Sequence, residues 1–259
     1  FQFLIRIVRS FKGELEFSLR ENYFNLYFRG NNAAKVTFES NGKYRIYIHE
    51  KFYPRSLETD VRFSSATSGV YRVIETTSEF LHPLLQKSRL NTIYSKIKKE
   101  NYSDELAFEQ ILITDNSDRE DLILIDRQVT DTKLTRRRMD LLALSQKQEN
   151  QYQFLVLEVK MGNNPELSGK VAQQLEIYVD HIDKCFKDYK LCYEKHYHQK
   201  KKFGMIDKPE WDEIEIVPGV QGMIVVGGHS VIAREQINSL RENHSKLKVQ
   251  LFEQKISVS

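Results

Sequence analysis

Two short apolar runs that carry charged residues place the tightest constraint on how this chain folds. The first is Met-Asp-Leu-Leu-Ala-Leu at 139–144, and the second is Phe-Leu-Val-Leu-Glu-Val-Lys at 154–160. Each run is rich in branched residues and bounded by polar segments, which is typical of a buried sheet strand. Side chains two apart in a strand share a face, so Glu158 and Lys160 emerge together at the end of the second strand. If the strand that carries Asp140 pairs beside it, two carboxylates and an ammonium group converge on one point.

Such a cluster has the chemistry of a metal site with a base. Two close carboxylates resist joint ionisation unless a cation offsets their repulsion, and oxygen ligands suit a hard ion such as Mg²⁺ or Mn²⁺. The backbone carbonyl of Val159 would add a further oxygen to those of Asp140 and Glu158. Lys160, beside the ion, would orient or deprotonate an attacking water. Together these residues predict a phosphodiester hydrolase.

The segment that follows predicts a helix with two more polar residues on the same side. Gln174 and Tyr178 are four apart, and both side chains can hydrogen-bond a phosphate or a metal-bound water. In this order, Asp140, Glu158-x-Lys160 and Gln174-x-x-x-Tyr178 resemble the PD-(D/E)xK nuclease superfamily, in the branch where RecB-type nucleases carry a Gln-x-x-x-Tyr motif.

The resemblance is closest to the NucS family of branched-DNA and mismatch endonucleases. It covers roughly the last three-fifths of the chain, and the matching pieces lie at 103–109, 125–128, 138–143, 157–160 and 221–227. It implies a Mg²⁺-dependent DNA endonuclease, in which Mn²⁺ substitutes, with a restriction-endonuclease-like mixed sheet flanked by helices. Glu105 matches the family's first acidic residue and would bind the metal directly or through water. The chain departs from the family in a longer linker at 145–153 and an apparent insertion at 183–218.

The amino-terminal part predicts β-structure. Asn41-Gly42 between two alternating runs is a strong signal for a two-residue hairpin, and residues 1–8 predict another strand. Alternation predicts a core face, and an opposite face with Arg29 and Arg45 among tyrosines, which is a combination that stacks bases and holds phosphates. A solvated sheet face explains that pattern equally well. In the resembling family a β-rich amino-terminal domain serves DNA binding and dimerisation.

The expected fold class is therefore α+β or α/β, with a smaller β-rich domain before the nuclease domain. We expect a recognition or dimerisation domain at 1–82 and a nuclease domain at 83–259, with the joint as late as residue 102. Pro83 would open a helix through Lys99, and a second helix would run from Asp104 to about Ile113.

Basic residues before Asp140 predict contacts with nucleic acid. Arg136, Arg137 and Arg138 lie at the mouth of the proposed site, where they would neutralise phosphates that flank the scissile bond. Arg127, at the end of the preceding strand, is a weaker candidate for the same role. A solvated turn is the alternative explanation for three adjacent arginines.

The helix that begins near residue 170 keeps its apolar spacing as far as about residue 193. The lysines of 195–202 that follow predict a mobile basic loop. Cys192, His196 and His198 have metal-binding side chains, but a fourth zinc ligand at normal spacing is missing.

Composition limits the remaining choices. The chain has 259 residues and a net charge of +3, so any attraction to nucleic acid must come from local clusters. Cys185 and Cys192 are too far apart along a helix to bridge within it, and reduced thiols in a cytoplasmic protein are expected. No apolar run approaches the length of a membrane span, so no membrane partner is expected.

The pattern as a whole predicts a DNA endonuclease that acts in repair or in defence against foreign DNA. The alternatives are cleavage of RNA, a module that binds nucleic acid without cleaving it, and a protein-interaction scaffold. Each motif alone also has an ordinary structural explanation, since Glu-x-Lys is usually a solvated strand end. Cleavage of both strands would favour a homodimer, because one such site cleaves one bond at a time.

Overall fold

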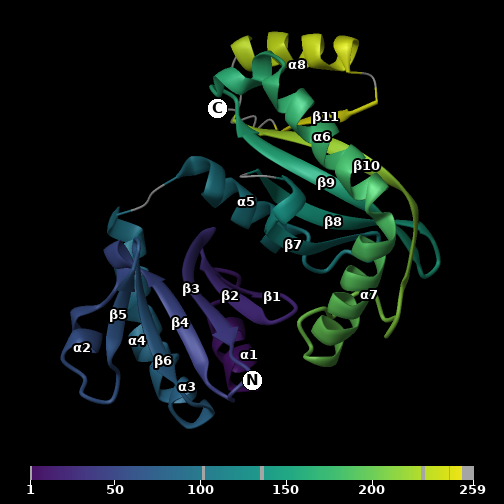
Figure 1. Ribbon diagram of the computed structural model, residues 1–259. Coiled ribbons are helices and arrows are strands. Elements are labelled where there is room, and N and C mark those ends of the chain that lie inside the picture. The colour runs from purple at the N-terminus through teal and green to yellow at the C-terminus, as the bar shows by residue number, and fades with distance from the viewer. Residues whose placement is uncertain (1, 101–102, 135–136, 229–230, 245, 253–259) are drawn as a thin grey trace, which may run out of the picture. The chain divides into compact units, whose positions relative to one another are not determined.

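The computed structural model describes residues 2–100, 103–134, 137–228, 231–244 and 246–252. The chain divides into two compact units, Phe1–Gln110 and Ile111–Ser259. The division falls within helix α5 (Asp104–Asp115), later than the joint expected near residue 82 or 102. Figure 1 shows the helices and strands of each unit.

The first unit contains a six-stranded sheet in the order β1-β2-β3-β4-β6-β5, and all neighbouring strands are antiparallel. This is the smaller β-rich part that the sequence predicts. Its elements are α1 (Gln2–Ser10), β1 (Leu15–Leu19), β2 (Tyr23–Phe28), β3 (Asn31–Phe38), β4 (Tyr44–His49), η1 (Glu50–Phe52), α2 (Arg55–Glu58), β5 (Ser65–Ser68), β6 (Tyr71–Thr76), α3 (Ser78–Leu84) and α4 (Lys87–Glu100).

Tight turns set the register of the first unit. The hairpin predicted at Asn41-Gly42 joins β3 to β4, but its loop spans residues 40–42 rather than two residues, because the Glu39 N–H donates to the Lys43 carbonyl (2.9 Å). Gly42 has a φ of 77°, whereas Asn41 does not have a positive φ. Arg29-Gly30 joins β2 to β3 with φ values of 46° and 79°, the positive pair that a two-residue hairpin turn with right-handed strand twist requires. Among the side chains predicted on the core face, Phe24, Leu26 and Ile46 are buried, whereas Tyr44 is half-buried.

Three expectations for the first unit are wrong. Residues 2–10 form helix α1 rather than a strand, because a short apolar run fits either period and here two consecutive residues, Leu4 and Ile5, are buried. Pro83 lies near the end of α3 and does not open a helix; it lacks the N–H that would continue α3, and α4 begins at Lys87. Tyr27, one of the tyrosines expected on the face opposite the core, is buried, because a register shift beside it interrupts the alternation.

The second unit contains a five-stranded mixed sheet in the order β11-β10-β9-β8-β7. β7, β8 and β9 form an antiparallel meander, whereas β10 is parallel to both β9 and β11 (Figure 1). Helices cover it, so the predicted α+β class with a mixed sheet is confirmed. Beyond α5 its elements are β7 (Leu122–Thr130), η2 (Thr132–Leu134), β8 (Arg138–Gln148), β9 (Gln151–Met161), η3 (Pro165–Ser168), α6 (Lys170–Lys184), α7 (Phe186–Lys202), β10 (Glu215–Gly227), α8 (Val231–Asn243) and β11 (Lys248–Phe252).

Helix α6 packs closely on the sheet and thereby positions the site. Phe154 and Val156 of β9 share one core with Leu175 and Tyr178 of α6. Because side chains alternate along a strand, Glu158 lies on the same face of β9 as Phe154 and Val156. On β10, a Cβ atom at Gly222 would lie 3.0 Å from the Leu175 side chain, so glycine at this position allows the close approach of helix to strand.

The segments expected as a linker and a loop are regular structure. β8 and β9 extend through most of 145–153 and leave only a short turn between them. The basic residues at 195–202 lie in helix α7, which begins at Phe186 after α6 ends at Lys184, so the predicted mobile loop is wrong. Lys200 is buried and donates to the Ile125 carbonyl (2.6 Å). At least one of these lysines therefore has a structural role within the second unit.

Two of the three residues with zinc-binding side chains, Cys192 and His196, lie close together on α7. Cys192 Sγ lies 3.9 Å from His196 Nε2, and within the described ranges no group of three or more His, Cys, Asp or Glu side chains is placed to hold a metal ion. None of the helices in the described part of the chain is long and apolar enough to cross a membrane.

Candidate active site

The ends of two paired strands bring Asp140 and Glu158 together. Leu141 of β8 is paired with Leu157 of β9 in an antiparallel register. Asp140, which precedes Leu141, and Glu158, which follows Leu157, therefore lie at neighbouring positions of the two strands. Asp140 Oδ2 accepts a hydrogen bond from the Val159 N–H (2.9 Å). Because the N–H and C=O of one residue in an extended strand point to the same side, the Val159 carbonyl faces the β8 side of β9 as well.

The ammonium of Lys160 lies between the two carboxylates. Its Nζ atom is 3.0 Å from Glu158 Oε1 and 3.7 Å from Asp140 Oδ2. The lysine residue is 5% exposed, so these charges meet in a largely desolvated setting. The structure therefore brings together the two acids and the amine that the sequence singles out.

The Glu158 carboxyl group carries the strongest electrostatic perturbation of the site. Burial and the charge of Asp140 together raise its pKa to about 8, although Lys160 acts in the opposite direction. Its Oε2 atom is buried and makes no hydrogen bond within the described structure. A buried carboxylate oxygen without a donor is costly, and a cation would satisfy it.

Helix α6 contributes the two polar residues expected on one of its faces. Gln174 Nε2 donates to Glu158 Oε1 (2.8 Å) and to the Tyr178 hydroxyl (2.9 Å). The Tyr178 hydroxyl in turn donates to the Arg138 carbonyl (3.0 Å), and burial raises the Tyr178 pKa. These bonds hold the Glu158 side chain and the start of β8 against the helix.

A third carboxylate, Glu166, also reaches Lys160. Its Oε2 atom lies 3.9 Å from Lys160 Nζ, and its Oε1 atom accepts from Lys170 Nζ at 2.5 Å. The hydrogen bond from Lys170 lowers the Glu166 pKa, which is the opposite shift to that of Glu158. Sequence reasoning missed Glu166 because it lies in the polar segment after β9, and only the turn η3, capped by the Asn164 side chain, brings it back to the site.

The acidic set seen in the second unit contains fewer ligands than the sequence predicts. Glu105 lies on the part of α5 that belongs to the first unit, so its role as a ligand stays a prediction. Asp140 and Glu158, with the Val159 carbonyl, are the remaining predicted oxygens.

The predicted nucleic-acid contacts have different surroundings. Arg137 and Arg138 are exposed and line a groove beside Gln174 and Tyr178. Arg127 is buried in β7 at 0% exposure, so a direct contact would require it to be uncovered. Arg136 lies outside the described residues.

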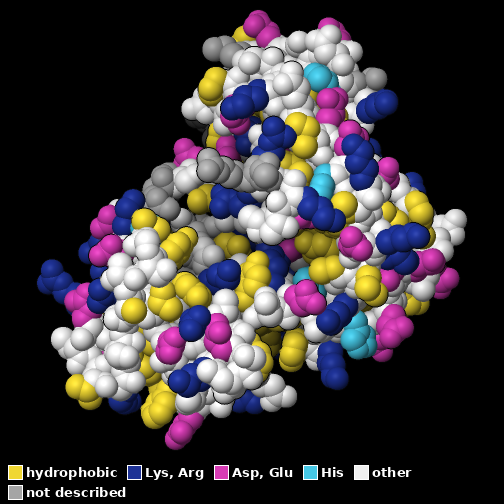
Figure 2. Space-filling view, viewed as in Figure 1, with side chains coloured by type: hydrophobic (Ala, Val, Ile, Leu, Met, Phe, Trp, Pro, Cys, Tyr) yellow, Lys and Arg dark blue, Asp and Glu magenta, His cyan; other side chains and the backbone are white. Residues whose placement is uncertain are grey.

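Both arginines predicted on the first unit are ion-paired. Arg29 is paired with Glu14, and Arg45 is paired with Glu75 (2.9 Å) and Glu39 (3.7 Å). Their charges are already balanced by carboxylates. On the face shown in Figure 2, lysine and arginine side chains are interspersed with acidic ones, so the local charge near the groove matters more than a broad basic surface.

No protein-family model matches the chain, and no curated protein matches it. Among solved structures it is similar to a repair endonuclease from Pyrococcus abyssi, with 14% identity over 98% of this chain and 96% of the other, at a TM-score of 0.28. It is also similar to the EndoMS–dsDNA2 complex, with 12% identity over 98% of this chain and 94% of the other, again at a TM-score of 0.28. These scores are too low to assign a function, so we argue it from the residues of this chain.

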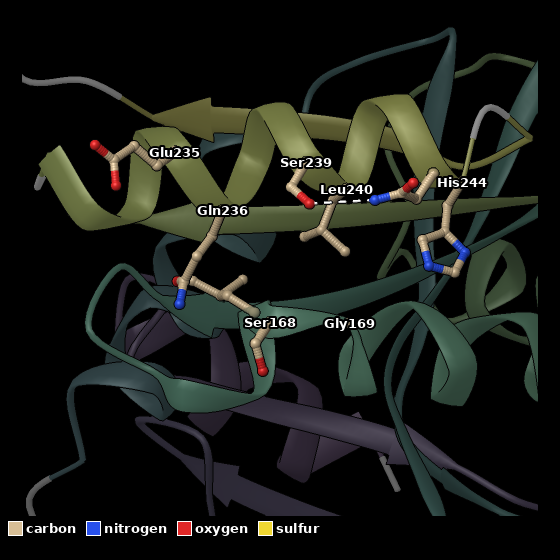
Figure 3. A pocket seen from close by; sticks show the side chains of 9 residues that line it. Ser168, Gly169, Glu235, Gln236, Ser239, Leu240 and His244 are labelled. Carbon is tan, nitrogen blue, oxygen red and sulfur yellow. Dashed lines mark hydrogen bonds between the residues drawn. The ribbon is translucent and has the colours of Figure 1, made fainter.

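A second pocket lies between η3 and α8 (Figure 3). Ser239 accepts a hydrogen bond from Asn243 (3.2 Å), as Figure 3 shows, and His244 Nδ1 lies 2.9 Å from Glu176 Oε1. Among its described lining residues, Glu235 is the one carboxylate and there is no lysine or arginine. The pocket therefore lacks the charge density of a phosphate or divalent-metal site.

Proposed function

We propose that this protein is a metal-dependent endonuclease that hydrolyses phosphodiester bonds in DNA, in repair or in defence against foreign DNA. The observation that carries the proposal is the buried Glu158 carboxyl group beside Asp140, with the Lys160 ammonium within 4 Å of both. Two acids and an amine on adjacent strand ends are an unfavourable arrangement to bury unless the site uses them. This chemistry suits the displacement at a phosphate better than it suits a structural ion pair.

The donor set fits a hard divalent cation such as Mg²⁺ or Mn²⁺. Asp140, Glu158 and the Val159 carbonyl would hold the ion, and Glu105 would contribute directly or through water. The buried Glu158 Oε2 atom, which has no donor in the described structure, supports this assignment. When bound, the ion supplies Lewis-acid polarisation of the phosphate and lowers the pKa of water.

The side chains around the acids perform the remaining work. Lys160 positions the attacking water and offsets the negative charge that develops on the phosphate oxygens. Gln174 orients Glu158 through its hydrogen bond, and Tyr178 ties the helix to the backbone at Arg138. We therefore assign Gln174 and Tyr178 as positioning residues of the site.

A cleavage assay with matched variants tests the proposal. Plain duplex, mismatched, forked and single-stranded DNA, together with RNA, are incubated with Mg²⁺ or Mn²⁺ and the products are resolved by size. Asp140→Asn should abolish cleavage, whereas Asp180→Asn, an exposed acid on α6, should leave it unchanged. Calorimetric titration with Mn²⁺ gives a second readout, because Asp140→Asn should also weaken binding of the ion. Equal cleavage by wild type and Asp140→Asn would refute the proposal, and product from RNA alone would change the substrate.

A module that binds nucleic acid without cleaving it is the second candidate. It is favoured by the absence, within the described ranges, of a group of three His, Cys, Asp or Glu side chains placed to hold a metal ion. That candidate requires salt-sensitive binding with no product under either ion. Two-strand cleavage by the enzyme would require two sites, which a homodimer would supply.

A further inference from the structure

A groove of about 400 Å³ opens beside the candidate active site. Arg137 and Arg138 form one wall at the start of β8, and the first turns of α6 form the other with Lys170, Gln173 and Ile177. Gln174 and Tyr178 complete it and also form the hydrogen-bonded network that reaches Glu158. Two of the residues that line the groove therefore also belong to the candidate active site.

The groove carries positive charge that the described structure leaves partly uncompensated. Among its described lining residues none is Asp or Glu. Across the part of the chain that the structure describes, no ion pair joins Arg137 or Arg138 to an acid, in contrast to the paired Arg29 and Arg45. An open, ligand-sized groove with this charge favours an anion.

Lys170 has a counter-ion that connects the groove to the catalytic lysine. It lies in the first turn of α6, where the helix dipole disfavours a cation, and its partner is Glu166 at 2.5 Å. The Lys170 side chain is 71% exposed and that of Glu166 is 30% exposed. Glu166 is at the same time 3.9 Å from Lys160. An exposed lysine–glutamate pair is weak, so another anion can replace the carboxylate with little loss.

We propose, building on the proposed function, that Lys170 acts with Arg137 and Arg138 to hold a backbone phosphate of the nucleic-acid strand next to the scissile bond. In the free protein Lys170 is paired with Glu166, and the incoming phosphate displaces the Glu166 carboxylate from Lys170. Two guanidinium groups and an ammonium group around one groove can all donate to the oxygens of a phosphate, whereas a single carboxylate offers fewer acceptors. Gln173 and the partly exposed Ile177 line the same groove and are available to the adjoining sugar or base.

A double-mutant cycle on binding tests this exchange. Fluorescence anisotropy of a fluorescein-labelled DNA oligonucleotide, single-stranded or duplex, is measured without divalent ions so that no cleavage occurs. Lys170→Ala should weaken binding about fivefold, the scale of one exposed ion pair. It should reduce the slope of log K against log salt by about 0.9 for the duplex or about 0.7 for the single strand, as for one lost phosphate contact.

Substitution of the competing carboxylate, Glu166, is the more specific test of the exchange. Glu166→Gln should tighten binding about twofold to fivefold, because the phosphate no longer displaces a carboxylate. The same substitution in a Lys170→Ala background should have no effect. Lys208→Ala is the matched control, since Lys208 forms an exposed pair with Glu120 (2.7 Å) and does not line the groove.

The outcomes separate this subsite from the nuclease proposal. Unchanged binding by Lys170→Ala, or an equal effect of Glu166→Gln in both backgrounds, would overturn the subsite even if the wild type cleaves DNA. If the variants show the predicted changes in DNA affinity but the wild type yields no cleavage product, the phosphate subsite is supported and the endonuclease assignment is refuted. Failure of the wild type to bind either form of DNA overturns both. Thermal melting of each variant confirms that an exposed substitution has left the fold intact.

Discussion

Replacing Glu158 with glutamine tests the burial that gives the site its electrostatic character. In the metal-free protein, burial and the charge of Asp140 raise the Glu158 pKa from 4.5 to about 8. Between these pH values the folded protein holds a proton that the unfolded chain has released, so folding stability falls as pH rises. The contribution of Glu158 to the free energy of unfolding is fully present below the pKa that it has in the unfolded chain, and it is lost as pH rises through about 8. The difference of about 3.5 units sets an upper limit on the order of 5 kcal/mol, at about 1.4 kcal/mol per unit.

Urea unfolding in the presence of a chelator measures this effect. Between about pH 5 and about pH 8, the free energy of unfolding of the wild type should fall relative to that of Glu158→Gln, whose amide does not titrate. We expect a relative change of about 2 kcal/mol, because relaxation and water penetration reduce the limiting value. Parallel curves for the two proteins would show that Glu158 is ionised at neutral pH and would refute the reasoning.

A neighbouring glutamate provides a control of opposite sign. The hydrogen bond from Lys170 lowers the Glu166 pKa, so the stability due to Glu166 is present above its unfolded pKa and is lost as pH falls. Glu166→Gln should therefore differ from the wild type most at neutral pH and least in acid. Addition of Mn²⁺ near pH 8 should raise the wild-type melting temperature and leave that of Glu158→Gln nearly unchanged, since only the native site binds the ion.

Three further predictions follow from the same geometry. Lys160→Ala should lower turnover by roughly 10²-fold or more while leaving DNA affinity nearly intact, and an unchanged cleavage rate in the purified variant would contradict its role. Tyr178→Phe removes the hydroxyl that donates to the Arg138 carbonyl and should cost about 1 kcal/mol in urea unfolding, whereas no loss would mean that water replaces this bond. Gly162→Ala should destabilise by about 3 kcal/mol and Gly222→Ala by about 1 kcal/mol. The Cβ added at position 162 would lie 2.6 Å from a backbone oxygen, whereas the Cβ added at position 222 would lie 2.8 Å or more from side-chain atoms, which can shift more easily. Equal melting temperatures of the two variants would argue against this packing.

The pairs of side chains within the candidate site follow largely from local sequence. Side chains alternate along a strand and repeat every three to four residues on a helix whatever lies around them. For that reason, Glu158 and Lys160 share a face of β9, and Gln174 and Tyr178 share a face of α6, as their spacing predicts. The presence of a hairpin here is predictable for a similar reason, because the positive φ of Gly42 is a local backbone requirement; its longer loop was not predicted.

Tertiary packing decided the features that no local period encodes. The apolar run at 2–10 is short enough to satisfy a strand or a helix, and its surroundings make it α1. The lysines at 195–202 are helical because α7 packs on the second unit's core and buries Lys200. Glu166 reaches Lys160 only through the turn at η3.

The electrostatic state of the site belongs to this second category. The sequence by itself determined which side chains share a face, because backbone geometry repeats locally. Only the three-dimensional arrangement removed Glu158 from water and set its pKa near 8, since desolvation and charge proximity depend on residues distant in the chain.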